Sequence, residues 1–278
     1  MTRFAVCFLL VFGQLAFGGL LAIALPPFFK VERGFYRSSA AVYLSAALLT
    51  AIGFGFLAYG GTRPGAPAGS SLWIVTIVWI LFCIAVSVYL VTLYIELDYL
   101  RARVYSLGLA IGLVGVLAGS FVLEPTGFGI IVAIGYAATA ILSSLMLGFA
   151  SAAMLFGHWY LIDPNLPVDY LRTMVRFLGW ALILDLGALL LIAATLALFG
   201  SSGASLALKN LFASDWVLLL MRMLLGPVAS LALTWMTWQT LKIPQTMAAT
   251  GLLYIAVMSV LVGEFLGRFI LFRTALPL

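Results

Sequence analysis

Residues Leu72–Ile95 read LWIVTIVWILFCIAVSVYLVTLYI, an unbroken apolar run without a charged side chain. A transmembrane helix needs roughly 20 consecutive apolar residues, so this run has the length of a full membrane span. The whole chain of 278 residues has the same character, because 65% of its residues are hydrophobic, 8% are charged and its mean hydropathy is +1.22. Soluble domains carry far more charge, and the composition therefore predicts a protein whose solvent is the lipid bilayer.

Working outward from this run, seven further segments have the composition and length of spans. The eight expected spans are Phe4–Phe29, Ala40–Gly60, Leu72–Ile95, Val104–Leu123, Gly127–Phe156, Val175–Phe199, Asp215–Thr240 and Gln245–Phe272. The first is too long for the apolar core of a signal peptide and is expected to be retained. No connection is long enough to hold a soluble domain. The sequence therefore predicts an all-α integral membrane protein, with residues 1–278 forming a single transmembrane domain of about eight helices.

The basic residues predict how these helices are oriented. The loops after spans one, three, five and seven carry Lys30, Arg33, Arg37, Arg101, Arg103, Arg172, Arg176 and Lys242, whereas the other side carries Arg3, Arg63, Lys209 and Arg273. Cytoplasmic loops are enriched in Lys and Arg, so both termini are expected outside, in a multi-pass protein of the bacterial inner membrane. The net charge of +5 is spread over these loops and does not indicate binding to nucleic acid.

A carboxylate and a guanidinium lie one helical turn apart in the last span, at Glu264 and Arg268. Ionised groups inside a bilayer are costly, so they tend to be paired and to mark functional regions. Glu before Arg at i, i+4 is the favourable order for an ion pair within a helix. Three interpretations remain open: a structural pair that locks the last helix against its neighbours, a polar lining for a quinone headgroup or proton path, and a pair at the membrane interface.

Other polar residues lie in apolar surroundings. Arg222 is expected at nearly the depth of Glu264, and Asp185 falls near the middle of its span. Either would be costly alone, so pairing between them is one interpretation and a proton relay through Asp185 is the other. Gln14 in the first span is expected to bridge helices by hydrogen bonding.

His158 is the only histidine, and it ends the fifth span on the predicted cytoplasmic side. It is interpreted either as an interfacial hydrogen-bonding residue or as a residue that handles protons or quinone. A single histidine cannot supply bis-histidine haem ligation, although a His–Met pair stays open. Cys7 and Cys83 lack metal-ligand spacing and are expected to be packing residues, so no metal site is predicted. No motif of a self-contained catalytic site occurs in the chain.

Two short motifs resemble a known family. Phe12-Gly13-Gln14-Leu15-Ala16-Phe17-Gly18-Gly19 resembles the FGQxxxGG stretch that opens the membrane-anchor subunits of dimethyl-sulfoxide-reductase-type enzymes, within the wider polysulfide-reductase-like group. Gly263-Glu264-Phe265-Leu266-Gly267-Arg268 is similar to the GExxGRxxFY signature in the last helix of that family. The resemblance covers about 20 residues at the two ends of the chain.

The resemblance implies an anchor without haem that oxidises quinol and passes electrons to an iron–sulfur subunit and on to a molybdenum catalytic subunit. Glu264, Arg268 and Gln14 then contribute to the quinone site, to which Arg222 is added by its depth, while Asp185 and His158 are candidates for a proton relay. The chain departs from the family in having no histidine in Gly60–Ser71 and Leu271-Phe272 in place of Phe-Tyr.

The leading hypothesis is therefore an anchor subunit of a respiratory or photosynthetic electron-transfer complex, and at most a quinol-oxidising part of an enzyme. Two alternatives stay open. One is a non-catalytic scaffold or assembly subunit that packs cofactor-bearing proteins together. The other is a small-solute or ion transporter that uses Asp185 and Arg222 near the middle of the membrane.

Overall fold

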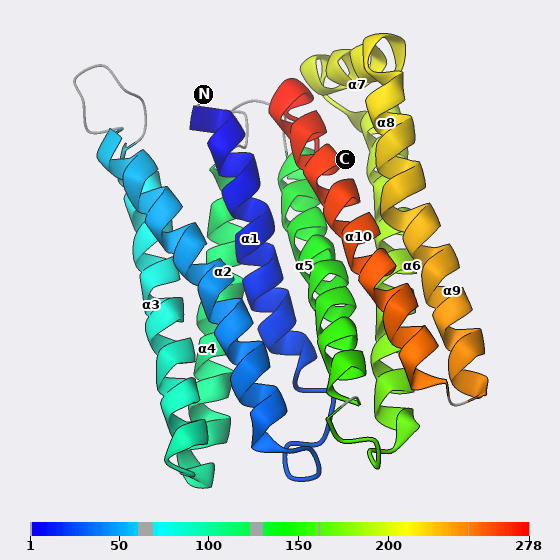
Figure 1. Ribbon diagram of the computed structural model, residues 1–278. Helices are drawn as coiled ribbons and strands as arrows, with labels where there is room; N and C mark the ends of the chain where they lie inside the picture. The colour runs from blue at the N-terminus through cyan, green and yellow to red at the C-terminus, as the bar shows by residue number, and fades with distance from the viewer. Residues whose placement is uncertain (1, 61–68, 123–129, 161, 244, 278) are drawn as a thin grey trace.

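A computed structural model describes residues 2–60, 69–122, 130–160, 162–243 and 245–277 (Figure 1). Within these ranges the regular elements are all helical. They are α1 (Thr2–Ala22), α2 (Arg33–Gly60), α3 (Gly69–Tyr94), α4 (Asp98–Phe121), α5 (Ile130–Trp159), α6 (Val168–Phe199), α7 (Ser202–Ser214), α8 (Trp216–Met223), the π-helical turn η1 (Leu224–Val228), α9 (Ala229–Lys242) and α10 (Thr246–Thr274). Arg63, the side chain of Arg3 and the expected span ends at Leu123 and Gly127 lie outside the residues described.

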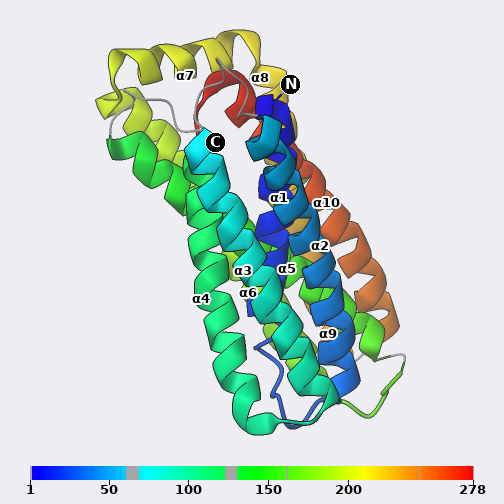
Figure 2. The same ribbon diagram turned by 90° about the vertical axis from the view of Figure 1, so that its left-hand side faces the viewer.

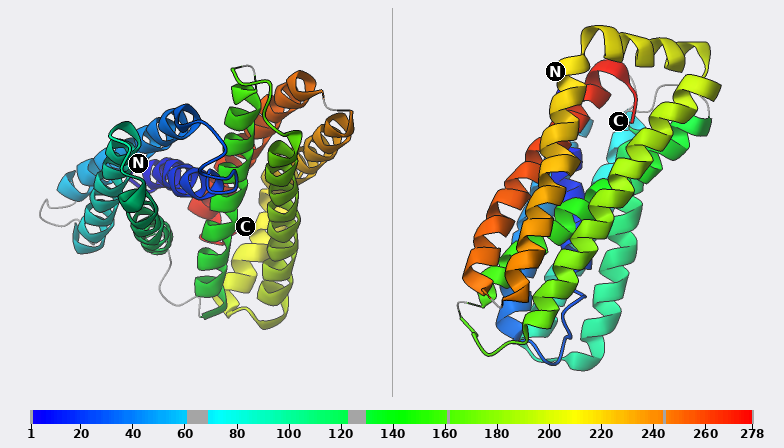
Figure 3. Two further views of the ribbon diagram at one scale, coloured as in Figure 1. Left: turned by 90° about the horizontal axis from the view of Figure 1, so that it is seen from below. Right: turned by 90° about the vertical axis from the view of Figure 1, so that its right-hand side faces the viewer.

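Eight membrane spans are present in the described chain, as the sequence predicts, if α8, η1 and α9 are counted as one. They form two groups of four, visible in Figure 3 when the bundle is seen along its axis. The helices α1 to α4 make the first group, and α5, α6, α8–α9 and α10 make the second. Both chain ends lie at one end of the bundle, here called the terminal end (Figure 1). The opposite end is called the basic end. The sequence predicts eight basic residues in its loops, but only Lys30 lies in a connection, and the other seven lie near the ends of helices: Arg33, Arg37, Arg101, Arg103, Arg172, Arg176 and Lys242.

The first span is shorter than expected. A run to Phe29 was predicted to be helical, but α1 ends at Ala22 and is followed by turns. Pro26 and Pro27 explain the difference, because proline lacks a backbone N–H and the residue before it is pushed out of the helical region. The side chain of Phe29 is consequently exposed in the connection to α2.

The seventh span is interrupted rather than continuous. Pro227 lies inside the π-helical turn η1, between α8 and α9. A proline ring cannot donate to the helix ladder and collides with the carbonyl one turn earlier. The wider π turn accommodates this residue, and such turns occur often at functional sites. The chain therefore crosses the membrane here with a local break in its helix geometry.

The helix α7 was not predicted from the sequence, where its residues formed only a connection between two spans. It lies across the terminal end of the second group, roughly perpendicular to the spans (Figures 1 and 2). The side chains of Ala204, Leu208 and Leu211 share one buried face and pack into an apolar cluster with Ile192 of α6 and Ile270 of α10. Ser201 is the N-cap of the helix, and its side chain accepts a hydrogen bond from the Ala204 N–H at 3.4 Å. It thus caps one half of the bundle.

The two groups meet where α1 crosses α5 with backbone against backbone. A Cβ atom on Gly148 would lie 2.7 Å from Gly18 Cα, and one on Gly18 would lie 3.2 Å from Ser144 Cα. Such contacts matter in lipid, where no water-driven force pulls helices together and close packing of small residues takes its place.

Gly148→Ala is therefore expected to force α1 and α5 apart and to lower the melting temperature of the detergent-solubilised protein. Overpacking typically costs about 1–3 kcal/mol. Gly187→Ala in α6 is the matched control, because a Cβ there meets nothing within 4 Å. That change should leave the melting temperature unchanged or raise it, since Ala is favoured over Gly in a helix by about 1 kcal/mol. Equal melting temperatures for the two variants would contradict the close crossing.

Candidate functional site

Three charged side chains from three helices meet inside the second group. Arg222 of α8 donates from Nη2 to Glu264 Oε1 of α10 at 2.9 Å and to Asp185 Oδ2 of α6 at 3.5 Å. Asp185 lies near the middle of α6, and Glu264 lies in the half of α10 nearer the terminal end. One guanidinium thus bridges two carboxylates from separate helices.

Arg268, one turn after Glu264, extends this chain of contacts toward the first group. Its Nη2 lies 3.4 Å from Glu264 Oε2 and donates to Ser143 Oγ of α5 at 2.8 Å and Gln14 Oε1 of α1 at 3.1 Å. The backbone carbonyl of Arg268 also accepts from Cys7 Sγ of α1 at 3.2 Å. The six side chains Gln14, Ser143, Asp185, Arg222, Glu264 and Arg268 are called the polar network below.

The network is shielded from the surroundings and electrically balanced. The exposed fraction is 0% for Asp185, 1% for Glu264, 3% for Arg222 and 6% for Arg268. Two guanidinium groups face two carboxylates, so the formal charges cancel. An isolated buried charge is very costly, whereas a paired and hydrogen-bonded one is tolerated. The pairing explains how four ionised residues can coexist inside an apolar bundle.

The close approach of Arg222 to Glu264 depends on two glycines. A Cβ on Gly263 would lie 2.9 Å from the backbone N of Gly226, which belongs to the π turn η1. The backbones of η1 and α10 therefore pack directly against each other. Because Arg222 lies one turn before Gly226 and Glu264 directly follows Gly263, this contact brings their side chains within hydrogen-bonding distance.

An apolar cavity of about 160 Å³ reaches the network from the side of α6, α7 and α8. Its lining residues are Leu189, Leu190, Ala193, Phe212, Leu219, Arg222 and Met223. Leu190 and Phe212 are 59% and 56% exposed, which places the opening of the cavity on the outer surface of the bundle. Arg222 is the single polar residue in the wall. We call this space the Arg222 cavity.

Some polar atoms of the network keep unused hydrogen-bonding capacity. Within the described part of the chain, Asp185 Oδ1 and Arg222 Nε and Nη1 are buried without a hydrogen-bond partner. Buried polar groups are usually satisfied, and exceptions call for an explanation such as a catalytic role or a bound molecule. Gln14 Nε2 and Arg268 Nε are also without a partner, so the unused capacity is spread over the network and includes, at Arg222, the side of the Arg222 cavity.

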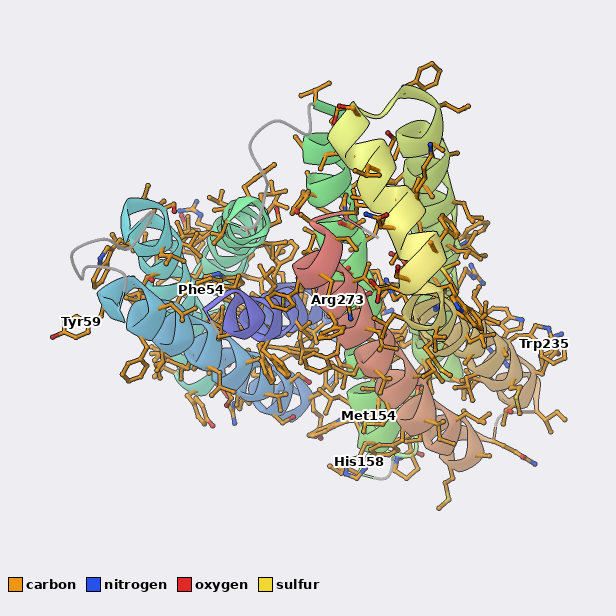
Figure 4. All side chains as sticks on the ribbon, turned by 90° about the horizontal axis from the view of Figure 1, so that it is seen from above. Phe54, Tyr59, Met154, His158, Trp235 and Arg273 are labelled. Carbon is orange, nitrogen blue, oxygen red and sulfur yellow. The ribbon has the colours of Figure 1, made fainter. Side chains whose placement is uncertain are left out.

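The structure brings together five of the six residues singled out from the sequence: Gln14, Asp185, Arg222, Glu264 and Arg268. The pair expected between Asp185 and Arg222 is present, but the nearest cation to Glu264 is Arg222 rather than Arg268 on its own helix. His158 is separate from the network. It lies exposed at the basic end of α5 (Figure 4), where Tyr254 Oη is 3.4 Å from its Nδ1.

Ser143 is the member of the network that sequence reasoning missed. Serine is common in membrane helices, and the adjacent Ser144 illustrates its usual behaviour by donating to the Ala140 carbonyl of its own helix at 2.7 Å. The two neighbouring serines carry no sequence signal that separates them. Only the direction in which each side chain points identifies Ser143 as the partner of Arg268.

The fold and the network define the class of this protein as a multi-pass helical membrane protein with a neutral, buried cluster of charged residues. No protein-family model matches the chain, and no curated protein matches it.

Replacing Arg222 by methionine should destabilise the protein strongly, because Asp185 loses its cation and both carboxylates stay buried. Removing one partner of a buried ion pair costs about 3–5 kcal/mol. The matched control is Arg273→Met, which breaks a pair with Asp215 (3.0 Å) at the terminal end, where Arg273 is 47% exposed. Exposed pairs contribute about 1 kcal/mol or less. The melting temperatures of both variants are compared with that of the wild type by thermal unfolding monitored by size-exclusion chromatography. If both melting temperatures fall by a similar amount, the buried pairing is no more important than the exposed one.

Proposed function

We propose that this protein is the membrane-anchor subunit of an electron-transfer complex and that the Arg222 cavity receives the ring of a quinol. The observation that carries the proposal is an apolar cavity lined in part by Arg222, whose guanidinium belongs to the buried charge network. Ligand pockets for apolar molecules typically combine such walls with a few well-placed polar groups. The resemblance of the first and last helices to quinol-oxidising anchors supports the same assignment.

The dimensions and chemistry of the cavity fit a single ring. At about 160 Å³ it is smaller than the roughly 300 Å³ at which pockets for drug-sized ligands begin, so it suits a headgroup and not a larger molecule. The opening between Leu190 and Phe212 leads toward the lipid, where an isoprenoid tail would remain. The guanidinium can donate hydrogen bonds to a quinone oxygen, and the walls exclude water from the ring.

The residues beside the cavity suggest how protons would leave. Oxidation of a quinol releases two protons and two electrons. In this proposal Asp185 Oδ1, which has no hydrogen-bond partner in the described structure, accepts the two protons in turn and passes the first toward the terminal end before it takes the second. Arg222 holds the substrate oxygen and compensates the charge that develops on it.

The electrons pass to an extrinsic iron–sulfur partner at the terminal end and from there to the catalytic redox subunit. The proposal places the complex in a bacterial inner membrane with this end outside.

A scaffold subunit without redox function is the second candidate. The observation in its favour is that the four charges of the network already cancel, so the network is electrically complete with no ligand. In this case the network would serve only to hold helices from both groups in register. The two candidates differ in whether quinone is bound: a purified complex should contain quinone if the protein is a quinol-oxidising anchor and none if it is a scaffold.

Asp185→Asn tests the proposed proton acceptor, because the amide keeps the shape of the carboxylate but cannot take a proton. In a complex purified with its redox partners, quinol oxidation is expected to fall about 100-fold, the lower end of what a positioned acid or base contributes. Asp215→Asn is the control, since it removes a carboxylate at the terminal end that pairs with Arg273 outside the network. Unchanged turnover in Asp185→Asn, together with no quinone in the wild-type complex, would favour the scaffold.

Ala193→Leu tests the cavity without touching a charge. Ala193 lines the cavity, so a larger side chain there should fill part of the space and reduce the quinone that is extracted with the purified complex. Ala194→Leu is the matched control, because Ala194 is exposed on the neighbouring face of α6. Quinone extraction followed by chromatography measures the effect. Equal quinone content in both variants would show that the ring does not bind in this cavity.

A further inference from the structure

A second hollow lies on the outer surface of the bundle, between α6 and α9 near the basic end. It has a volume of about 350 Å³, and its walls include Arg176, Gly179 and Trp180 from α6 and Trp235 and Trp238 from α9. Figure 4 shows Trp235 pointing away from the bundle, in the direction of the surrounding lipid. We call this hollow the α6–α9 groove. None of its residues belongs to the polar network.

The groove contains one cation without a carboxylate partner. Arg176 is exposed, its guanidinium carbon lies 5.4 Å from the centre of the Trp238 ring, and it makes no ion pair in the described part of the chain. The nearest acid in sequence, Asp169, is held by Arg172 at 2.7 Å. Arg172 in turn donates to the Leu241 carbonyl of α9 at 2.7 Å. Arg176 is therefore the residue of the groove lining whose positive charge has no acidic partner in the described part of the chain.

One end of the groove, at Arg176 and Trp238, lies near the depth of lipid headgroups, and the rest extends toward the middle of the membrane. Arg176 follows the first residue of α6, Val168, by eight positions, which is about 12 Å along the helix axis. Trp238 precedes the last residue of α9, Lys242, by four positions, or about 6 Å. Tryptophans collect at this level of a membrane because their rings are apolar and their N–H is polar. The guanidinium thus lies where phosphate groups begin and acyl chains end.

We propose that the α6–α9 groove is a binding site for one anionic phospholipid. The Arg176 guanidinium offers paired donors to the lipid phosphate, a geometry for which arginine is well suited. Gly179 has no side chain, and a Cβ there would meet nothing nearer than Thr234 Cγ2 at 3.7 Å, so an acyl chain can lie along the groove between the tryptophans. Basic pockets between helices on the cytoplasmic side are known to favour anionic headgroups. The nearby Lys242 disfavours the quaternary amine of a zwitterionic lipid.

Native mass spectrometry of the purified full chain can test the site. The protein is equilibrated in micelles that contain equal amounts of phosphatidylglycerol and phosphatidylcholine, and the lipids retained per protein are counted. The wild type is expected to retain one phosphatidylglycerol in preference to phosphatidylcholine. Arg176→Gln is expected to reduce that preference about fivefold, as removal of one basic residue near a membrane surface should.

Arg103→Gln is the matched control. Arg103 is an exposed arginine of α4 at the same end of the bundle, and its guanidinium carbon lies 4.4 Å from the centre of the Tyr99 ring. This variant should keep the preference of the wild type. A loss as large as that in Arg176→Gln would show a general effect of surface charge and overturn the assignment of the site.

Gly179→Leu provides a second variant that keeps the charge of Arg176 but fills the groove. It is expected to lower the retention of phosphatidylglycerol. Its melting temperature is expected to equal that of the control variant Arg103→Gln, which would show that the protein remains folded. Two results would overturn the proposal: equal retention of the two lipids by the wild type, or unchanged phosphatidylglycerol retention in both Arg176→Gln and Gly179→Leu.

Discussion

The position of Arg222 between Asp185 and Glu264 is the constraint on which the rest of the structure depends. Lipid cannot solvate these groups, so each charge must find its partner inside the protein. The 2.9 Å contact to α10 and the 3.5 Å contact to α6 fix the rotation of three spans about their axes. The helices can move relative to one another only as far as these contacts allow.

The same network also joins the two halves of the bundle. Arg268 belongs to the second group, but it binds the Gln14 side chain of α1 and accepts from Cys7 through its backbone. These bonds join α10 to α1, the same helix that crosses α5 at Gly18 and Gly148. Hydrogen bonding and close backbone packing thus act together, as expected where the hydrophobic effect does not drive helix association.

Sequence patterns predicted the eight spans because membrane thickness sets a length that hydropathy can detect. The depth of Arg222 along its span also indicated its pairing with residues on neighbouring helices. The early end of α1 was missed although Pro26 and Pro27 were visible, since the apolar run continues beyond them. The helix α7 was missed because it is short and crosses no membrane.

The cavity beside Arg222 had no sequence signal at all. Its walls come from α6, α7 and α8, and the side chains that form it, mostly Leu, Ala and Met, are the same types that fill the rest of the bundle. Whether such residues leave a space depends on the angles at which the helices meet. That information is distributed over the whole fold and cannot be assigned to any one residue.

The π turn at Pro227 changes the direction in which the side chains of the seventh span point around the helix axis. Each residue of an α-helix advances the direction of its side chain by about 100°, and a π turn places an extra residue in one turn. Side chains in α9 therefore face directions that a regular continuation of α8 would not give them. Arg222 is turned inward before the break, while Trp235 faces lipid after it. Removal of Pro227 would take away both the extra residue and the ring that breaks the helix, and would rotate the side chains of α9 by about 100° relative to those of α8.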